Sequence, residues 1–162
     1  CRRIGAARGR FDVPDNIDAL NPAVADLFSG KEMLREKLLD THIVLWALAD
    51  SPRLPEAARK IIMDEDNHIL FSAASVWEVA IKHSLSPEQM PVSGADLLDC
   101  VRDAGYFELP VTSVHAAAIE ALPRRHKDPF DRILLAQAMS EPVRLLTHDS
   151  LLGGYGEPVL VV

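Results

Sequence analysis

The sequence contains almost no cysteine, no long apolar run, and no repeat or low-complexity segment. Its two cysteines, Cys1 and Cys100, have neither a metal-binding nor a redox spacing, which agrees with a reducing cytoplasm. Cys100 falls in an apolar helical pattern, so we expect a buried free thiol there. No apolar run is long enough to cross a bilayer, and no signal peptide opens the chain. These absences argue against a membrane or secreted protein and predict a cytoplasmic one.

What is present indicates one ordinary domain preceded by a short appendage. The chain has 162 residues, of which 48% are apolar, enough for a hydrophobic core. Residues 1–32 are interrupted by glycine and proline, and they predict one short helix that begins after Asn21. The apolar face of this helix would consist of Val24, Leu27 and Phe28. A segment with so few apolar residues becomes ordered only when it lies against another surface. We therefore interpret residues 1–32 as a docking arm and 33–162 as the domain.

The charge is distributed unevenly. A net charge of −7 argues at first against a nucleic-acid-binding protein. Residues 1–10, however, carry four arginines and no acid, whereas residues 33–162 carry 12 basic and 19 acidic side chains. If several of these acids converge on metal ions, the local charge at such a site is much less negative than the formal net charge of the chain suggests.

Short apolar runs alternate with helical patterns from Met33 onward. The predicted strands cover 37–41, 69–72, 107–111, 144–147 and 158–162. The predicted helices cover 42–49, 56–66, 73–83, 95–104, 113–122 and 129–140. This alternation predicts an α/β fold with a mostly parallel sheet that is covered by helices on both faces.

A basic run precedes the last of these helices. Pro129 suits the first turn of a helix, and Asp128 before it is a good N-cap. Arg124, Arg125 and Lys127 would then lie just before the helix, where they could hold the phosphates of a nucleic acid. The alternative for this run is a solvated loop.

Four acids from separate segments are expected to meet at one edge of the sheet. Asp40 ends the first strand, Asp149 follows the fourth, and Glu78 and Asp131 lie on helices. In an open parallel sheet, chemistry collects at the carboxyl ends of the strands. Clustered carboxylates repel one another unless a cation neutralises them, and hard oxygen ligands select Mg²⁺ or Mn²⁺. Such a site suits the attack of water on a phosphodiester.

Each of these residues also has a plainer interpretation. A single acid at a strand end is more often a cap, and Glu78 could form an outward salt bridge. His126 and His148 could be catalytic, but phosphate contacts or surface positions are commoner for such residues. We expect His42 to pack at the start of a helix. Trp46 and Trp77 are predicted to belong to the core.

Four motifs occur in order and together resemble one family. They are Leu39-Asp40-Thr41-His42, Ser72-Ala73-Ala74-Ser75-Val76-Trp77-Glu78-Val79-Ala80-Ile81-Lys82, His126-Lys127-Asp128-Pro129-Phe130-Asp131-Arg132 and Leu146-Thr147-His148-Asp149. Residues 33–162 thus resemble a PIN-domain ribonuclease of the VapC toxin type. The resemblance implies a three-layer α/β/α fold in which four acids bind metal and act in catalysis, namely Asp40, Glu78, Asp131 and Asp149. It also implies that Thr147 and Ser72 support these acids, and it leaves open whether Asp128 contacts the metal.

The first 32 residues are similar to the C-terminal tail of the antitoxins that partner such toxins. Gly5 to Asp18 and the Asp26-Leu27-Phe28-Ser29-Gly30-Lys31 segment carry this similarity. The chain then resembles an antitoxin tail joined to its own toxin at Met33. We expect Arg8 or Arg10 to enter the acidic site and replace the positive charge of the metal.

Both resemblances together imply the toxin of a type II toxin–antitoxin system. The expected activity is a Mg²⁺- or Mn²⁺-dependent endoribonuclease, with RNA as substrate, an antitoxin as partner and a homodimer as the assembly. Alternatives remain from the sequence: a DNA nuclease or a small phosphohydrolase that uses the same acids, and a silenced toxin–antitoxin complex that serves as a binding or regulatory module. A phosphate-accepting receiver domain would need a lysine near the last strand, and none lies there.

Overall fold

A computed structural model describes residues 35–123 and 127–162. Its strands are β1 (Glu36–Leu39), β2 (His68–Ser72), β3 (Phe107–Leu109), β4 (Arg144–Thr147) and β5 (Val159–Val161). Its α-helices are α2 (Thr41–Leu48), α3 (Glu56–Met63), α4 (Ala73–Leu85), α5 (Gly94–Asp103), α6 (Ser113–Ala118) and α7 (Pro129–Ser140), with 3₁₀ turns η2 (Ile119–Ala121) and η3 (Leu152–Tyr155). The arm with Arg8 and Arg10 and the three residues Arg124, Arg125 and His126 lie outside the described residues.

The five strands form one parallel sheet in the order β3-β2-β1-β4-β5. Leu39 at the end of β1 pairs with Phe71 on one side and with Leu146 on the other. This register places Asp40, the residue after β1, next to the end of β4, where the amide of Asp40 donates to the carbonyl of Leu146 at 3.0 Å. The carboxyl ends of the two central strands therefore meet at one edge.

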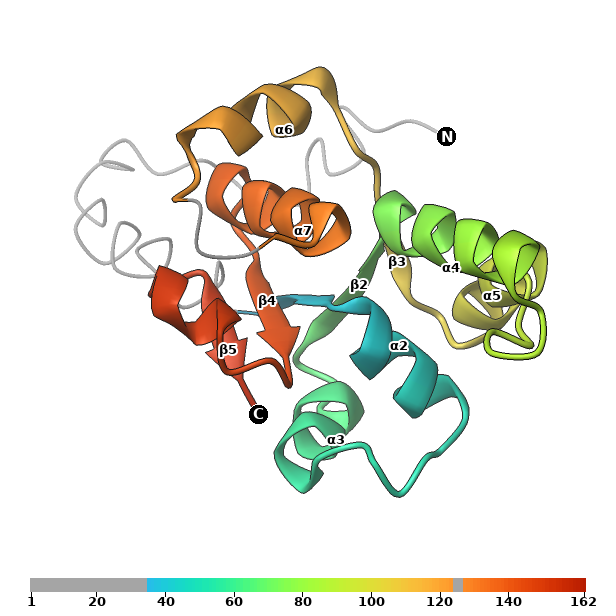
Figure 1. The fold of residues 1–162 in the computed structure, drawn as a ribbon. Helices are drawn as coiled ribbons and strands as arrows, with labels where there is room; N and C mark the ends of the chain where they lie inside the picture. Colours follow the sequence, from blue (N-terminus) through green and yellow to red (C-terminus); the bar gives the residue numbers. More distant parts are fainter. Residues whose placement is uncertain (1–34, 124–126) are drawn as a thin grey trace, which may run out of the picture. The chain divides into compact units, whose positions relative to one another are not determined.

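Helices cover both faces of the sheet, because its strands are apolar on both sides. Leu38 and Leu145 face a core that α7 and α6 cover, while Leu39 and Leu146 face a second core against α2 and α3. Figure 1 shows α6 and α7 on one side of the sheet and α2 and α3 on the other. The predicted α/β/α layering and parallel sheet are confirmed.

Helix starts follow the side chains that can cap them. Five helices begin directly after a capping side chain that accepts a backbone N–H, namely Asp40, Ser72, Ser93, Thr112 and Asp128. The predicted helix 129–140 and strand 144–147 have the observed bounds. The predicted strand 37–41 is two residues too long at its carboxyl end, because Asp40 caps α2 instead of continuing the strand. The predicted helix 113–122 divides into α6 and η2.

Two predictions of burial are wrong. Cys100 is exposed, because it lies off the stripe of α5 on which Leu97 and Val101 are buried. Trp77 is 58% exposed, and its ring packs edge-on against Phe130 with ring centroids 5.0 Å apart. In the described parts of the chain, no helix combines the length and the apolar character that a bilayer crossing requires.

Candidate active site

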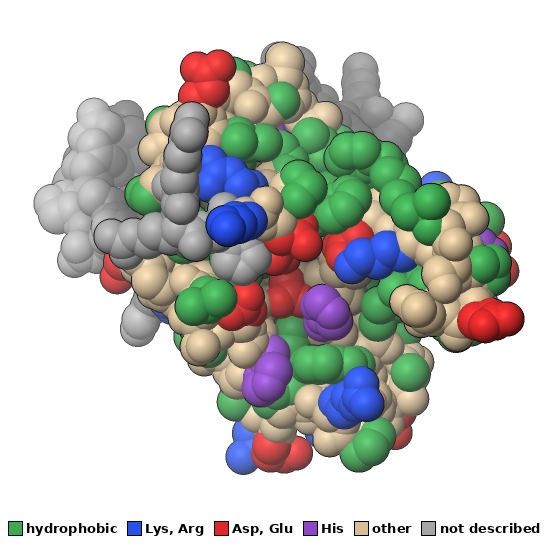
Figure 2. Space-filling model, in the orientation of Figure 1, with side chains coloured by type: hydrophobic (Ala, Val, Ile, Leu, Met, Phe, Trp, Pro, Cys, Tyr) green, Lys and Arg blue, Asp and Glu red, His purple; other side chains and the backbone are tan. Residues whose placement is uncertain are grey.

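Three of the four predicted acids line one open pocket at the carboxyl end of the sheet. The pocket has a volume of about 390 Å³ and is lined by Asp40, His42, Trp46, Arg53, Asp131, His148 and Asp149. In Figure 2 acidic side chains lie near the centre of the visible face, with histidines beside them. The chain thus brings together acids that are separated by up to 109 positions in the sequence.

Asp40 is held in place through both of its carboxylate oxygens. Oδ1 accepts the amides of His42 at 2.7 Å and Ile43 at 3.1 Å, which caps α2. Oδ2 accepts the hydroxyl of Thr147 in a short hydrogen bond. The positive end of the α2 dipole also favours a negative charge here. These contacts therefore hold Asp40 as a fixed oxygen donor, of which only 4% is exposed.

Thr147 connects two of the acids. Its hydroxyl donates to Asp40 and accepts the amide of Asp149 at 3.0 Å. Asp149 in turn accepts the amide of Leu151 at 2.8 Å through Oδ1, which turns the chain after β4. Because Thr147 is completely buried, this link fixes the spacing of the two acids against solvent competition.

The start of α7 contributes Asp131 from its first turn. Asp128 is the N-cap, and its Oδ1 accepts the amides of Phe130 at 2.8 Å and Asp131 at 3.4 Å. Asp131 lines the pocket, whereas Asp128 does not. Asp128 therefore orients the helix that presents Asp131. Like α2, α7 brings the positive end of its dipole to the acids.

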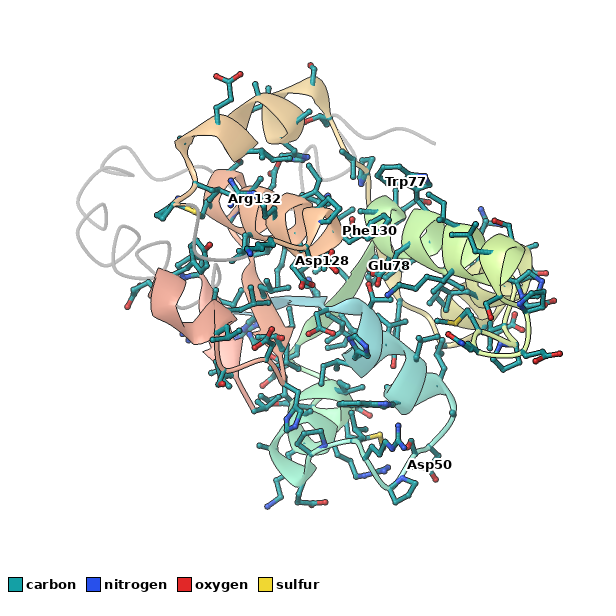
Figure 3. All side chains as sticks on the ribbon, viewed as in Figure 1. Asp50, Trp77, Glu78, Asp128, Phe130 and Arg132 are labelled. Carbon is teal, nitrogen blue, oxygen red and sulfur yellow. The ribbon has the colours of Figure 1, made fainter. Side chains whose placement is uncertain are left out.

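Glu78 lies beside the pocket and does not line it. It is 4% exposed, and it accepts the Thr41 hydroxyl at 2.6 Å and the Lys82 ammonium in a short ion pair across one turn of α4. Thr41 follows Asp40 directly, so this hydrogen bond ties Glu78 to the first residue of α2. Figure 3 labels Glu78 on α4 and Asp128 at the start of α7.

Lys82 pairs with Glu78, and its charge also interacts with two acids at the start of α7. Burial alone would lower the pKa of Lys82, but the hydrogen bond and charge of Glu78 and the charges of Asp128 and Asp131 raise it above its ordinary value of 10.5. The ammonium therefore stands in the combined field of three carboxylates. The salt bridge considered for Glu78 does exist; its Glu78 end is buried, and its Lys82 end is 43% exposed.

Comparison with known proteins agrees with this arrangement. The sequence matches the PIN domain family over residues 37–155. The chain belongs to the PIN-domain family. It is 31% identical over 126 residues to Ribonuclease VapC22 of Mycobacterium tuberculosis (strain ATCC 25618 / H37Rv), a match that covers 75% of this chain and 92% of the relative. The PIN domain described here is therefore of the VapC type.

Two solved structures share the fold of this PIN domain. VapBC2 from Rickettsia felis, bound to a DNA fragment from its promoter, superposes with a TM-score of 0.57 at 14% identity, and the match covers 78% of this chain and 97% of that one. A toxin–antitoxin complex from Klebsiella pneumoniae gives a TM-score of 0.54 at 16% identity, with 77% and 96% covered. At these identities the likeness concerns the fold.

Ser72 supports a helix of the PIN domain rather than an acid. It caps α4 through the amide of Ala74 at 3.0 Å and donates to Gln137 Oε1 at 2.6 Å. The Gln137 amide in turn donates to the carbonyls of Leu109 and Pro110 at 3.3 and 3.2 Å. Sequence reasoning did not single out Gln137, although a polar residue within the apolar Leu134 to Ala138 run of a helix was a usable signal.

The donor set fits a hard divalent cation. Asp40, Asp131 and Asp149 offer only carboxylate oxygens to the pocket, which is the chemistry that Mg²⁺ and Mn²⁺ prefer. Within residues 35–123 and 127–162, no three His, Cys, Asp or Glu side chains are grouped closely enough to hold a metal ion. The pocket thus has donor types that suit such a cation, but its three carboxylates do not stand in a metal-binding arrangement in this structure. Glu78 is held to one side by Thr41 and Lys82.

Aromatic rings form the wall of the pocket next to the acids. Trp46 lies between His42 and His148, with ring centroids 5.8 Å and 5.6 Å away. Both histidines are exposed, and Nδ1 of His148 lies 2.9 Å from the carbonyl of Val162. Trp46 is half-buried, so it is a pocket residue as well as part of the packing that we predicted for it.

Proposed function

We propose that this PIN domain is a Mg²⁺- or Mn²⁺-dependent endoribonuclease and the toxin of a type II toxin–antitoxin pair that acts in the cytoplasm. The observation that carries the proposal is the single pocket lined by Asp40, Asp131 and Asp149. The 31% identity to a relative named as a ribonuclease supports RNA as the substrate.

Asp40, Asp131 and Asp149 would hold the cation, and Glu78 is the fourth acid within the same network. When bound, a divalent cation supplies a Lewis acid and lowers the pKa of water toward neutrality, which suits hydrolysis of a phosphodiester. The protein supplies the positions of the carboxylates. Thr147 fixes Asp40 relative to Asp149, and Asp128 fixes the turn that presents Asp131. Because these groups are set before substrate arrives, little reorganisation is needed during the reaction.

The test is cleavage of RNA by the purified chain with Mg²⁺, with Mn²⁺ and with excess chelator. Cleavage should require the metal and should be lost in Asp40→Asn, which keeps the oxygen that caps α2. Asp66→Asn, at an exposed acid in the turn before β2, is the matched control and should retain activity. A single-stranded DNA of the same sequence separates a ribonuclease from a DNA nuclease. Full Mn²⁺-dependent activity in Asp40→Asn would refute the assignment.

The arm leads to a second part of this proposal. The two solved relatives are toxin–antitoxin complexes, which supports an antitoxin as the partner. We infer that residues 1–32 act as an inhibitory antitoxin-like tail, with Arg8 or Arg10 compensating the charge of the acids. The chain should then be less active than residues 33–162 alone, and Arg8→Ala/Arg10→Ala should relieve the inhibition at limiting Mg²⁺. Equal activity of the chain and the 33–162 fragment would exclude an inhibitory arm.

An exposed apolar groove supports the expected homodimer. Ala73, Trp77, Val111, Ile119 and Ile133 are among the residues lining this groove of about 480 Å³ between α4, α6 and α7. Trp77 in this lining is 58% exposed, and exposed apolar surface of this kind is typical of interfaces. Sedimentation should show a dimer that Trp77→Ser shifts toward monomer, with Leu151→Ser, at an exposed leucine in the turn after β4, as control.

A further inference from the structure

The aromatic wall of the pocket has no role in holding a metal. His42, Trp46 and His148 stand side by side beside the acids, and Arg53 lines the same pocket. Trp46 contacts the second hydrophobic core on one side and the pocket on the other. A residue needed only for packing would not require two exposed rings around it. The wall therefore places aromatic rings and a guanidinium in the same pocket as the three acids.

We propose that this wall is a stacking subsite for the base of an unpaired nucleotide next to the phosphate that is cleaved. The inference rests on the proposed ribonuclease function and specifies which side chains would hold the base next to the cleaved phosphate. The rings of His42 and His148 are inclined to Trp46 by 50° and 69°, so the base would stack on one ring and contact the edges of the others. Arg53 would contact the neighbouring phosphate or stack on the base.

The chemistry of the wall explains why the strand must be unpaired. A base inside a duplex has both faces covered by its neighbours, so only a loop, a bulge or an end can offer a face to Trp46. Stacking tolerates every base, because each base has a π face. The subsite would therefore select single strands over duplexes and contribute affinity without strict sequence preference.

Trp46 itself supplies the most direct readout. The chain has two tryptophans, so Trp77→Phe leaves Trp46 as its only indole and keeps an aromatic ring against Phe130. The variant also carries Arg8→Ala/Arg10→Ala, so that the proposed inhibitory arm does not compete for the site. We expect a ten-nucleotide single-stranded RNA, added to this 162-residue variant in chelator, to quench the Trp46 emission. A blunt RNA duplex of equal length should quench it much less. A series of oligonucleotides with one abasic position each should identify the nucleotide whose base is needed.

Variants separate stacking from packing. Trp46→Ala should weaken binding of the single strand by about 5- to 150-fold, which corresponds to the loss of one stacked base. Trp46→Phe should restore most of that affinity, because a benzene ring still offers a π face. If Trp46→Ala does not fold, His42→Ala at the exposed side of the wall is measured instead and should weaken binding by a smaller factor. His68→Ala is the matched control, since His68 is exposed and lines no part of this pocket.

The outcomes distinguish the subsite from the proposed function. Metal-dependent RNA cleavage with an unchanged KM in Trp46→Ala would overturn the stacking subsite and leave the ribonuclease intact. Absence of RNA cleavage by both the chain and residues 33–162 would instead remove the ribonuclease function. Trp46 emission that does not respond to saturating single-stranded RNA, or an affinity that is the same for every abasic oligonucleotide, would also overturn the proposal.

Discussion

Strands β1 and β4 lie side by side, with Lys37 and Arg144 paired near their amino end and Asp40 and Asp149 following their carboxyl end. Each end gathers two side chains of like charge. At the carboxyl end the repulsion is opposed by Thr147 and by the positive N-termini of α2 and α7. Lys82 adds a full positive charge to the same end of the sheet.

The amino end has much weaker compensation. Lys37 is only 7% exposed, and burial together with the charge of Arg144 lowers its pKa, which Asp64 opposes in part. Nε of Arg144 is buried without a hydrogen-bond partner in the described parts of the chain. At the carboxyl end of these strands, hydrogen bonds and positive charge thus stabilise the two acids next to each other. At the amino end the two basic side chains have little such stabilisation. This difference marks the carboxyl end as the functional one.

The largest effect should come from breaking the link at the carboxyl end. Thr147→Val keeps the shape of the side chain but removes the hydrogen bonds to Asp40 and from Asp149. A hydrogen bond to a charged group contributes about 1.5–3 kcal/mol, so urea unfolding should show a loss of about that size. RNA cleavage should fall as well, because Asp40 is no longer fixed relative to Asp149.

Arg144→Met, at the other end of β4, is the matched control for that experiment. It removes one of two like charges and should leave cleavage unchanged. A Thr147→Val protein with the stability and the cleavage rate of the parent would show that the carboxyl end is not organised by this hydroxyl.

The sequence could predict what local chemistry decides. Asp128 and Pro129 together specify where α7 begins, and the Arg144 to Thr147 run is short, apolar and followed by His-Asp, so both predicted elements have the observed bounds. The rule that functional residues gather at the carboxyl ends of parallel strands also predicted that Asp40 and Asp149 lie at one edge of the sheet. These successes depend on capping, on proline geometry and on the parallel sheet, all of which neighbouring residues express.

Tertiary contacts decided what the sequence could not predict. Helix α4 is apolar around most of its circumference, so periodicity did not show that Trp77 faces outward while Glu78 faces inward. The position of Glu78 depends on Thr41, 37 residues earlier, and on Lys82. Only the folded chain shows that Lys82 pairs with Glu78 and that its charge also interacts with Asp128 and Asp131.

A second variant tests whether Lys82 replaces a metal cation. Lys82→Met should destabilise the metal-free protein by about 1–2 kcal/mol, because Glu78 stays buried without its partner. This is less than the 3–5 kcal/mol typical of a fully buried pair, since the Lys82 side chain is 43% exposed and solvent screens it. Glu78→Gln/Lys82→Met should recover most of the loss in urea unfolding.

Divalent cations sharpen the same test. If Lys82 compensates the acids in the metal-free state, then Mg²⁺ should raise the melting temperature of Lys82→Met more than that of the parent. Calorimetric titration should show at least equal Mg²⁺ affinity in the variant. Weaker Mg²⁺ binding in Lys82→Met would mean that the ammonium assists the metal rather than standing in for it.

Removing the charge of Lys37 at the amino end should have a smaller effect on stability, and it should stabilise the protein rather than destabilise it. Because the pKa of Lys37 is lowered, its charged form is disfavoured in the folded state, and this penalty is fully present below the folded pKa. The penalty disappears as pH rises from that pKa toward the ordinary value of 10.5. Lys37→Met should therefore unfold at a higher urea concentration than the parent at pH 7, and the difference should shrink by pH 10. Lys60→Met, on the exposed side of α3, should show no such trend.

The smallest effect concerns the approach of RNA to the carboxyl end. Lys127 is the described member of the predicted basic run, and it is exposed directly before the cap of α7. A contact with one phosphate of a single strand changes the slope of log K against log salt by about 0.7, whatever the sequence. Lys127→Ala should therefore lower the slope by about that amount, weaken binding equally for unrelated single-stranded RNAs and leave stability unchanged. Lys60→Ala removes an exposed charge on α3 and serves as the control for net charge. If both variants lower the slope equally, Lys127 acts only through the overall charge of the protein. If only Lys127→Ala lowers it, RNA passes over the start of α7 on its way to Asp131.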